Sequence, residues 1–474
     1  MLPVRTIRPG LIALWMLNDA STVREKVEFM RACRGGGIEG LCMHPRSGNL
    51  IPYGSDEWFD MIRALVEEGR RLGIDMWLYD EDPYPSGVAG GLVTAERAEL
   101  RARYMALHEK PHDLRAGQLW RISESKVLWA GLVPVAESLP AVDMTARVGM
   151  VRSDWFMGDW DSRYYYPDTP VFPCPRGDAV RPFYTLRVPH VPIGYRLIAI
   201  SAELASEEGS WGSLPDLLNP ESFGLFRKLT LDRYHACVGE QFGLTIPGIF
   251  TDEAKAHGGM PITKDLFEDF ERTFGYSLRE RLYQLFGNAL SDDYIQARLD
   301  YRRWGATRFL DAFMRPYRRW CDEHGLYLVG HISPEDDPIQ EAVCVGSVMP
   351  IMKELSLPGT DIIVPFTGDW RAPALNLGSL RVGSLKSQHG RPYAMSETLA
   401  LCGWSVTSDR CRQLFAWQKV LGVDRFFVHG FFMSSEGVQN YEAPPDYGPH
   451  SSIFRGICAV NDWLKAVEGI LDGA

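Results

Sequence analysis

Eight apolar segments of strand length, separated by longer amphipathic stretches, are the feature that most constrains the fold of this 474-residue chain. Apolar runs that alternate with helical patterns are typical of repeated βα units, whose parallel strands are buried on both faces. The expected strands are residues 11–17, 38–44, 74–79, 246–251, 326–331, 361–366, 392–396 and 425–432. Eight such units predict an α/β fold, a (β/α)8 TIM barrel.

The long segment between the third and fourth expected strands does not follow this repeat. Its extended patterns, separated by Pro, Gly and Asp, predict strands at residues 126–136, 148–151, 181–188 and 196–202. We therefore expect a barrel from residues 1–95 and 213–474, with a mostly β insert at residues 96–212. A doubly wound sheet is the alternative fold, but no Gly-rich phosphate-binding turn opens a helix after the first strand.

Composition and charge exclude several classes of partner. The net charge is -11, and Lys and Arg form no dense basic block, so we expect no binding to nucleic acid. We expect no membrane segment, because no apolar run is long enough to cross a bilayer. The charged, proline-containing amino terminus differs from a secretory signal, and the nine Cys show no paired spacing. These features predict a cytoplasmic protein.

Polar side chains cluster just after the expected strands. In a closed parallel barrel the carboxyl ends of all strands face the same side, where active sites are built. These polar and aromatic residues are Asn18, Asp19, His44, Arg46, Asp80, Glu81, Asp82, Asp252, Glu253, His331, Glu335, Asp336, Asp337, Asp369, Trp370, Glu397, Trp404, His429 and Glu436. The sequence therefore predicts a polar site at that end of the barrel.

Glu253 and Glu397 are the expected catalytic pair. Glu is a poorer helix N-cap than Asp, which favours chemistry over capping at these two positions. Cleavage of a glycosidic bond needs one carboxylic acid to protonate the leaving oxygen and a second carboxylate to attack the ring or activate water. The residues expected to bind sugar hydroxyls and ring faces are Asn18, His44, Arg46, Asp80, Glu81, Asp252, His331, Glu335, Trp404, His429 and Glu436.

Each of these residues also has a structural interpretation. Asp252 could cap a helix, and His331 and His429 could be satisfied core histidines. Asp80 and Glu81 could instead form a buried salt bridge with an arginine.

Several strings resemble a known family of proteins. They are residues 77–87 (WLYDEDPYPSG), 89–91 (AGG), 247–253 (PGIFTDE), 396–398 (SET), 403–404 (GW), and His429 followed by 435–437 (SEG). They resemble bacterial glycoside hydrolase-like TIM-barrel proteins, among them family 106, the α-L-rhamnosidases. The resemblance extends over most of the barrel and excludes the insert.

The resemblance implies a catalytic acid at Glu253 and a second carboxylate at Glu397. The related retaining barrel glycosidases have Asn before the acid after the fourth strand, whereas this chain has Asp252. A negative neighbour raises the pKa of Glu253 and suits a general acid. Family 106 enzymes are described as inverting and calcium-assisted, so stereochemistry and a calcium ion both stay open. No acid group has EF-hand spacing and no Cys/His set suits zinc, so we expect no cofactor and no metal ligands.

Relatives of this kind commonly continue into β-sandwich domains, whereas this chain stops at Ala474. The chain is then either a minimal version or a fragment, and the insert or a second subunit of a homo-oligomer would shape the site. The alternative functions are a catalytically inactive carbohydrate-binding barrel protein and a metal-dependent barrel isomerase or lyase. A Schiff-base enzyme would need a lysine at a strand end, where Lys255 is a poor candidate.

Overall fold

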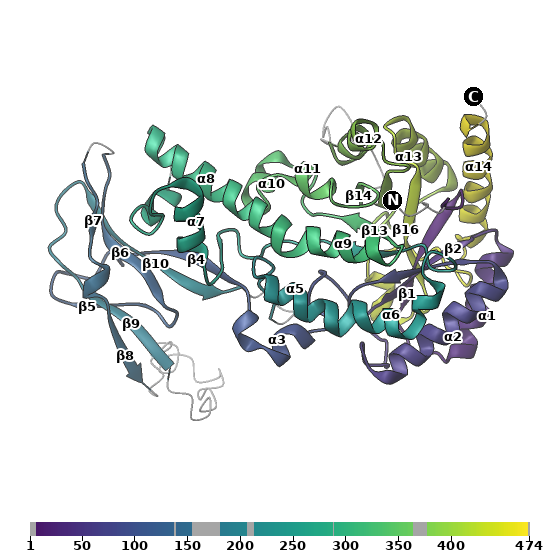
Figure 1. Cartoon of the computed structure of the whole chain (residues 1–474), viewed down its shortest axis with the longest axis horizontal. Coiled ribbons are helices and arrows are strands. Elements are labelled where there is room, and N and C mark those ends of the chain that lie inside the picture. Colours follow the sequence, from purple (N-terminus) through teal and green to yellow (C-terminus); the bar gives the residue numbers. More distant parts are fainter. Residues whose placement is uncertain are drawn as a thin grey trace. The chain divides into compact units, whose positions relative to one another are not determined.

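The computed structural model describes residues 6–136, 139–153, 181–205, 213–287, 289–363 and 377–472 (Figure 1). The chain divides into two compact units. The first unit contains Met1–Arg101, Ser206–Ala256 and Gly305–Ala474. The second contains Ala102–Ala205 and His257–Trp304.

The first unit is a nearly closed parallel barrel, which confirms the predicted fold class. Its eight strands follow the spatial order β13-β11-β3-β2-β1-β16-β15-β14. Their bounds are β1 Leu11–Leu17, β2 Gly40–Pro45, β3 Asp75–Tyr79, β11 Gly248–Asp252, β13 Tyr327–His331, β14 Gly359–Ile362, β15 Met395–Thr398 and β16 Arg425–Phe432. Each predicted strand overlaps one of these. The sixth was expected at residues 361–366 but spans Gly359–Ile362, and residues 364–376 lie outside the described residues.

Small residues let the two end strands of the sheet approach each other. A Cβ atom on Gly359 of β14 would lie 1.8 Å from the carbonyl oxygen of Gly330 on β13. Just before β14, the backbone N–H of Ser356 donates to the carbonyl oxygen of Leu328 at 2.8 Å. Glycine at position 359 permits this approach of the two backbones, whereas a Cβ on Gly330 would meet the carbonyl oxygen of Thr251 on β11.

Apolar side chains fill the barrel interior. The rings of Trp77 and Phe427 meet edge to face with centroids 5.2 Å apart, and Phe250 lies 5.2 Å from Phe427. Met16 and Met395 belong to the same buried cluster. The interior is therefore a packed core.

Helices follow the strands and pack around them. They are α1 Val23–Gly35, α2 Asp56–Leu72, α3 Leu92–Glu96, α5 Pro220–Phe226, α6 Asp232–Val238, α9 Arg315–Glu323, α10 Pro338–Cys344, α11 Val348–Met352, α12 Leu377–His389, α13 Ser408–Val420 and α14 Phe454–Asp472. Thr22 and Glu25 form a capping box on α1, and Gly73 ends α2 in the left-handed conformation. No helix among the described residues is long and apolar enough to span a membrane.

The second unit is built on two antiparallel sheets. Their strands are β4 Arg103–Glu109, β5 Leu119–Ser123, β6 Val127–Pro134, β7 Val142–Asp143, β8 Gly149–Ser153, β9 Arg181–Arg187, β10 Tyr195–Leu204 and β12 Pro261–Ile262. The first sheet has the order β12-β4-β10-β6-β7 and the second β5-β9-β8. Helix α7, Leu266–Phe274, also belongs to this unit, and α8, Asp292–Phe309, extends from it into the barrel unit.

This unit is larger than the predicted insert at residues 96–212. Residues 257–304 join it, although the sequence assigned them to the barrel. The reason is that β12 pairs with β4, and the Tyr301 hydroxyl donates to the carbonyl oxygen of Pro261 at 2.6 Å. Both contacts are between residues far apart in sequence, which periodicity does not reveal.

Candidate active site

Two pairs of strand neighbours place acidic and imidazole side chains at the carboxyl ends of the barrel strands. Asp252 on β11 lies opposite His331 on β13 in the parallel ladder. Asp361 on β14 likewise lies opposite Glu397 on β15. Side chains opposite each other in a parallel ladder project from the same face, so all four belong to one group.

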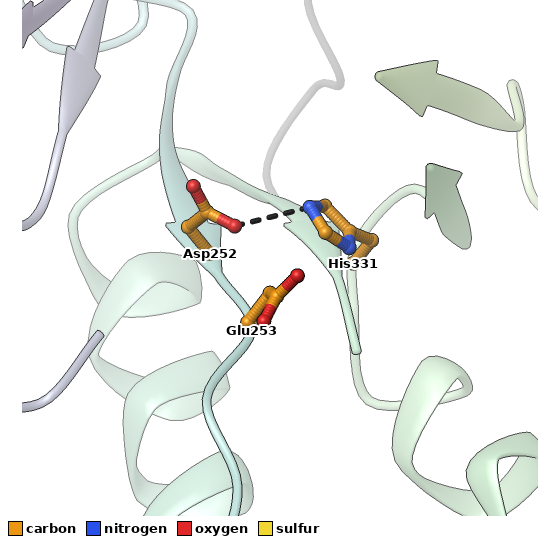
Figure 2. A group of neighbouring side chains, drawn as sticks. All are labelled: Asp252, Glu253 and His331. Atoms are coloured by element: carbon orange, nitrogen blue, oxygen red, sulfur yellow. Dashed lines mark ion pairs between the residues drawn. The ribbon is translucent and has the colours of Figure 1, made fainter. Parts of the chain in front are cut away.

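His331 is the centre of this group. Its Nε2 lies 3.1 Å from Oδ1 of Asp252 and 3.2 Å from Oε2 of Glu397. Its Nδ1 lies 3.6 Å from Oε1 of Glu335. Figure 2 shows the pairing with Asp252 and the side chain of Glu253, which also points toward the ring. The His331 side chain is only 2% exposed, so three carboxylates surround a buried ring.

Asp252 is held on both carboxylate oxygens. Its Oδ1 faces His331, and its Oδ2 accepts the hydroxyl hydrogen of Tyr79. The Tyr79 ring in turn stacks on His44, with centroids 3.6 Å apart. Burial alone would raise the pKa of Asp252, but the contacts with His331 and Tyr79 lower it to about 2. Asp252 is therefore an anion at neutral pH.

Glu253 is the more accessible acid of the proposed pair. Its side chain is 27% exposed, against 7% for Glu397, and its backbone has φ 47°. Such a left-handed conformation is uncommon for a residue other than glycine and is found repeatedly at functional sites. Its Oε2 lies 3.7 Å from Nζ of Lys255. Burial raises the pKa of Glu253, and the charge of Asp252 raises it further, the direction predicted from the sequence.

Glu397 and Asp361 are both buried acids with raised pKa values. Burial, together with the charge of Asp252, raises the pKa of Glu397 to about 7, although His331 opposes the rise. Burial and the charge of Glu397 raise the pKa of Asp361 well above its ordinary value. Glu335 accepts hydrogen bonds from Oγ1 of Thr360 at 3.1 Å and from the backbone N–H of Asp361 at 2.6 Å. Glu335 thereby fixes the end of β14.

His44, Arg46 and His429 form a basic cluster beside these acids. Arg46 donates through Nε to Glu442 at 2.6 Å, and its Nη1 lies 3.3 Å from Nε2 of His44. Burial and the charge of Arg46 lower the pKa of His44 well below its ordinary value and that of His429 to about 3. Both rings are therefore neutral, and Arg46 supplies the charge of this cluster.

Three of the predicted binding residues form hydrogen bonds with other residues of the protein. Asn18 donates to the carbonyl oxygen of Ser434 at 2.7 Å and accepts from its N–H at 3.0 Å. Asp80 accepts from Oγ of Ser86 at 2.5 Å and from the hydroxyl of Tyr317 at 2.9 Å. Glu81 accepts four backbone N–H groups of residues 82–90. Their contacts shape the loops, and none of them includes the arginine that the structural interpretation of Asp80 and Glu81 expected.

The remaining predicted residues lie on loops. Trp404 is 44% exposed and donates through Nε1 to the carbonyl oxygen of Asn440 at 3.3 Å. Glu436 is exposed after β16. Asp337 caps α10 by accepting the N–H of Ile339 at 2.8 Å. The expected Asp369 and Trp370 lie outside the described residues.

The structure adds Asp361, Tyr79 and Glu442 to the site. Asp361 was taken as the first residue of the sixth strand, which placed it at the wrong end of the barrel. Its signal is weak, because the strand around it, Gly359–Ile362, has only four residues. Tyr79 is the last residue of the third expected strand, and nothing in the sequence links Glu442 to Arg46.

The acids also raise the question of a metal. The ligand atoms of Asp252, Glu253 and His331, and those of His331, Asp361 and Glu397, lie within 4.8 Å of one another. Calcium takes roughly six to eight oxygen ligands. Here a nitrogen-bearing ring occupies the middle of the carboxylates, with its nitrogens 3.1, 3.2 and 3.6 Å from their oxygens. The described residues therefore do not fit calcium, and no step below uses one.

Comparison with known proteins gives structural but no sequence relatives. No protein-family model and no curated protein matches this sequence. A rhamnosidase from Novosphingobium sp. PP1Y is 13% identical and superposes with a TM-score of 0.62, covering 97% of this chain and 59% of its own. A β-galactosidase from the Antarctic haloarchaeon Halorubrum lacusprofundi is 12% identical, with a TM-score of 0.51, covering 96% of this chain and 57% of its own.

The chain thus spans less than three fifths of the length of either protein. At 13% and 12% sequence identity, these two structures are evidence for the fold alone. The chain has a TIM-barrel fold like that of known glycoside hydrolases.

Proposed function

We propose that this protein is a glycoside hydrolase. The observation that best supports the proposal is the placement of Glu253 directly after β11 and of Glu397 near the carboxyl end of β15, with both side chains beside His331. Paired carboxylates at strand ends supply the acid and the nucleophile or base that glycosidic cleavage needs. The similar fold of a rhamnosidase makes α-L-rhamnosides the first substrates to test.

The surroundings of the two acids favour different roles. Glu253 lies next to the anionic Asp252, which disfavours a second negative charge and raises the pKa of Glu253. Glu397 faces Nε2 of His331, which favours its charged form. Glu253 therefore acts as the general acid, and Glu397 acts as the nucleophile or base.

The test is a pair of isosteric variants. Glu253→Gln and Glu397→Gln remove the acid functions with little change in shape. Each should lower kcat by at least about a thousandfold on aryl α-L-rhamnosides or on the best substrate of a glycoside panel, with an unchanged circular-dichroism spectrum. Full activity in either variant would remove that residue from the mechanism. Glu323→Gln, at an exposed position at the end of α9, is the matched control.

The same measurements separate the alternatives. Saturable glycan binding without turnover across the panel would favour a catalytically inactive carbohydrate-binding protein. A metal-dependent isomerase or lyase is the second alternative, which the two groups of close donor atoms around His331 keep open. We propose a reaction without a metal or other cofactor, so activity should survive exhaustive chelation.

Two further features remain proposals. We propose a cytoplasmic location because the described cysteines, Cys33 and Cys42 among them, are free thiols. The anomeric configuration of the first product, followed by proton NMR, will tell retention from inversion.

A further inference from the structure

The buried ring of His331 is surrounded by negatively charged side chains. The Asp252, Glu335 and Glu397 carboxylates contact its ring at 3.1, 3.6 and 3.2 Å. Both ring nitrogens lie near carboxylate oxygens, but neither forms a well-aligned hydrogen bond with them, so the contacts are ionic. A neutral imidazole has only one N–H and would turn a lone pair toward a carboxylate. Because the side chain is 2% exposed, solvent cannot compensate for the mismatch. Only an imidazolium, in which both ring nitrogens carry a proton, presents a positive N–H group to the carboxylates on both sides of the ring.

We propose that His331 is a positioning residue: a permanently protonated imidazolium that joins Asp252 to Glu397 and holds Glu397 in place for its reaction. The inference rests on the proposed function of Glu397 and adds the group that orients it. The imidazolium occupies the position, between the carboxylates, where a bound cation would otherwise sit. This is why the donor set around it does not fit calcium.

Second contacts anchor two of the three carboxylates, those of Asp252 and Glu335. Asp252 is fixed by Tyr79, and Glu335 is fixed by the backbone N–H of Asp361 and by Thr360. Oε2 of Glu397 accepts no hydrogen bond from any described residue, so the charge of His331 is its main partner. A change at His331 should therefore affect Glu397 more than it affects the two anchored acids.

Other charged and titratable groups also act on this cluster. They are Glu253 next to Asp252, Asp361 opposite Glu397, Arg46 after β2, and Tyr79 on β3. The charge of Arg46 lowers the pKa of Glu397, and the contacts with Asp252, Glu335 and Glu397 raise the pKa of His331. The pKa of His331 is well above its ordinary value, although burial works against the charged form. This direction agrees with the geometry.

Nitrogen-15 NMR of the full-length protein, labelled in its histidine rings, tests the charge of His331 without a substrate. The His331 signal is identified by its absence in His331→Asn and, independently, by its shift in Asp252→Asn. We expect both ring nitrogens to be protonated at pH 8, and Asp252→Asn to lower the pH at which the ring titrates by about one unit or more. A singly protonated ring at pH 8, or a ring nitrogen bound to a metal, would overturn the proposal.

Carbon-13 NMR of glutamate-labelled protein tests the positioning role. The Glu397 carboxyl signal is assigned with Glu397→Gln. In His331→Asn we expect Glu397 to titrate about one pH unit or more higher than in the wild type, whereas His389→Asn, an exposed control on α12, should leave it unchanged. An unchanged titration in His331→Asn would contradict the role. Should His331→Asn fail to fold, Asp252→Asn must still shift the titration of the ring.

Activity distinguishes this proposal from the function on which it rests. If hydrolysis is present, His331→Asn should lower kcat by about a hundredfold with little change in KM, and should move the acidic limb of the pH profile upward. Loss of kcat without movement of the limb would indicate a merely structural histidine. If Glu253→Gln and Glu397→Gln keep full activity, the roles proposed for these glutamates fail, and if no glycoside is hydrolysed the proposed function fails; the NMR result for the charge of His331 stands in either case.

Discussion

Asp361 and Glu397 are direct neighbours in the parallel ladder of β14 and β15, and their ligand atoms lie within 4.8 Å of each other and of His331. Two acids this close cannot both ionise easily in a buried site. Burial and the charge of Glu397 raise the pKa of Asp361 well above its ordinary value. The surroundings therefore favour the protonated form of Asp361.

Asp361→Asn should consequently be well tolerated at neutral pH, because the amide resembles the protonated acid in shape and charge. We expect its free energy of unfolding at pH 7 to stay within about 1 kcal/mol of the wild type. The folded state binds the proton more tightly than the unfolded state, whose pKa is about 3.9. The wild type should therefore lose stability relative to Asp361→Asn as pH rises above about 4. Urea denaturation at several pH values measures this difference.

Asp113→Asn, at an exposed position, is the control for this series, and its difference from the wild type should show no such trend. A wild type that becomes more stable than Asp361→Asn as pH rises would mean that Asp361 is charged in the folded protein.

The pH dependence of hydrolysis should follow Glu397. Burial and the charge of Asp252 raise its pKa to about 7, and the proposed nucleophile or base must be ionised. Activity should therefore fall about tenfold for each pH unit below about 7. Glu253 must keep its proton, so activity should also fall at higher pH as that acid ionises. A profile of kcat/KM from pH 4 to 10 tests this, and a flat profile between pH 5 and 7 would contradict the assigned role of Glu397.

The strands were predictable because strands that are buried on both faces appear in the sequence as short continuous apolar runs. All eight were found within a few residues, and this placed Glu253, His331 and Glu397 at the correct end of the barrel. The error at the sixth strand came from its length, since a strand of only Gly359–Ile362 gives a weak pattern. A shift of two residues at that strand hid Asp361.

Partners that are far apart in the chain could not be predicted in this way. The sequence shows which polar side chains follow a strand. It does not show which of them form hydrogen bonds within the loops and are therefore unavailable to a substrate. Glu81 was expected to bind substrate, whereas the next nine residues fold back onto its carboxylate. The pairing of Arg46 with Glu442 depends on two loops that meet only in the folded barrel.

Glu81 should therefore affect stability more than binding. Its Oε1 accepts the N–H groups of Asp82 and Gly90 at 2.9 and 2.5 Å, and its Oε2 accepts those of Val88 and Ala89 at 2.7 Å each. In Glu81→Gln an amide NH₂ would face two of these donors. We expect a loss of about 3 kcal/mol in the free energy of unfolding, measured by urea denaturation.

The exposed substitution Glu323→Gln should change this free energy by no more than about 0.5 kcal/mol. A Glu81→Gln variant that is as stable as the wild type but binds substrate more weakly would show that Glu81 is a substrate-binding residue.

Trp404 should contribute to substrate binding and little to stability. The ring is 44% exposed on the loop after β15, the strand that ends beside Glu397, and its Nε1 donates to Asn440 at 3.3 Å. Tyr441, the next residue after Asn440, is 81% exposed, so two aromatic side chains are available on neighbouring loops. A flat apolar face suits the C–H side of a sugar ring.

Trp404→Ala should therefore raise KM by about tenfold, leave kcat within about threefold, and lower Tm by no more than about 2 °C. Val420→Ala, which truncates an apolar side chain that is 86% exposed at the end of α13, should leave all three values unchanged. Steady-state kinetics and thermal denaturation of the two variants decide the matter. Equal KM values in Trp404→Ala and the wild type would show that the ring does not contact the bound sugar.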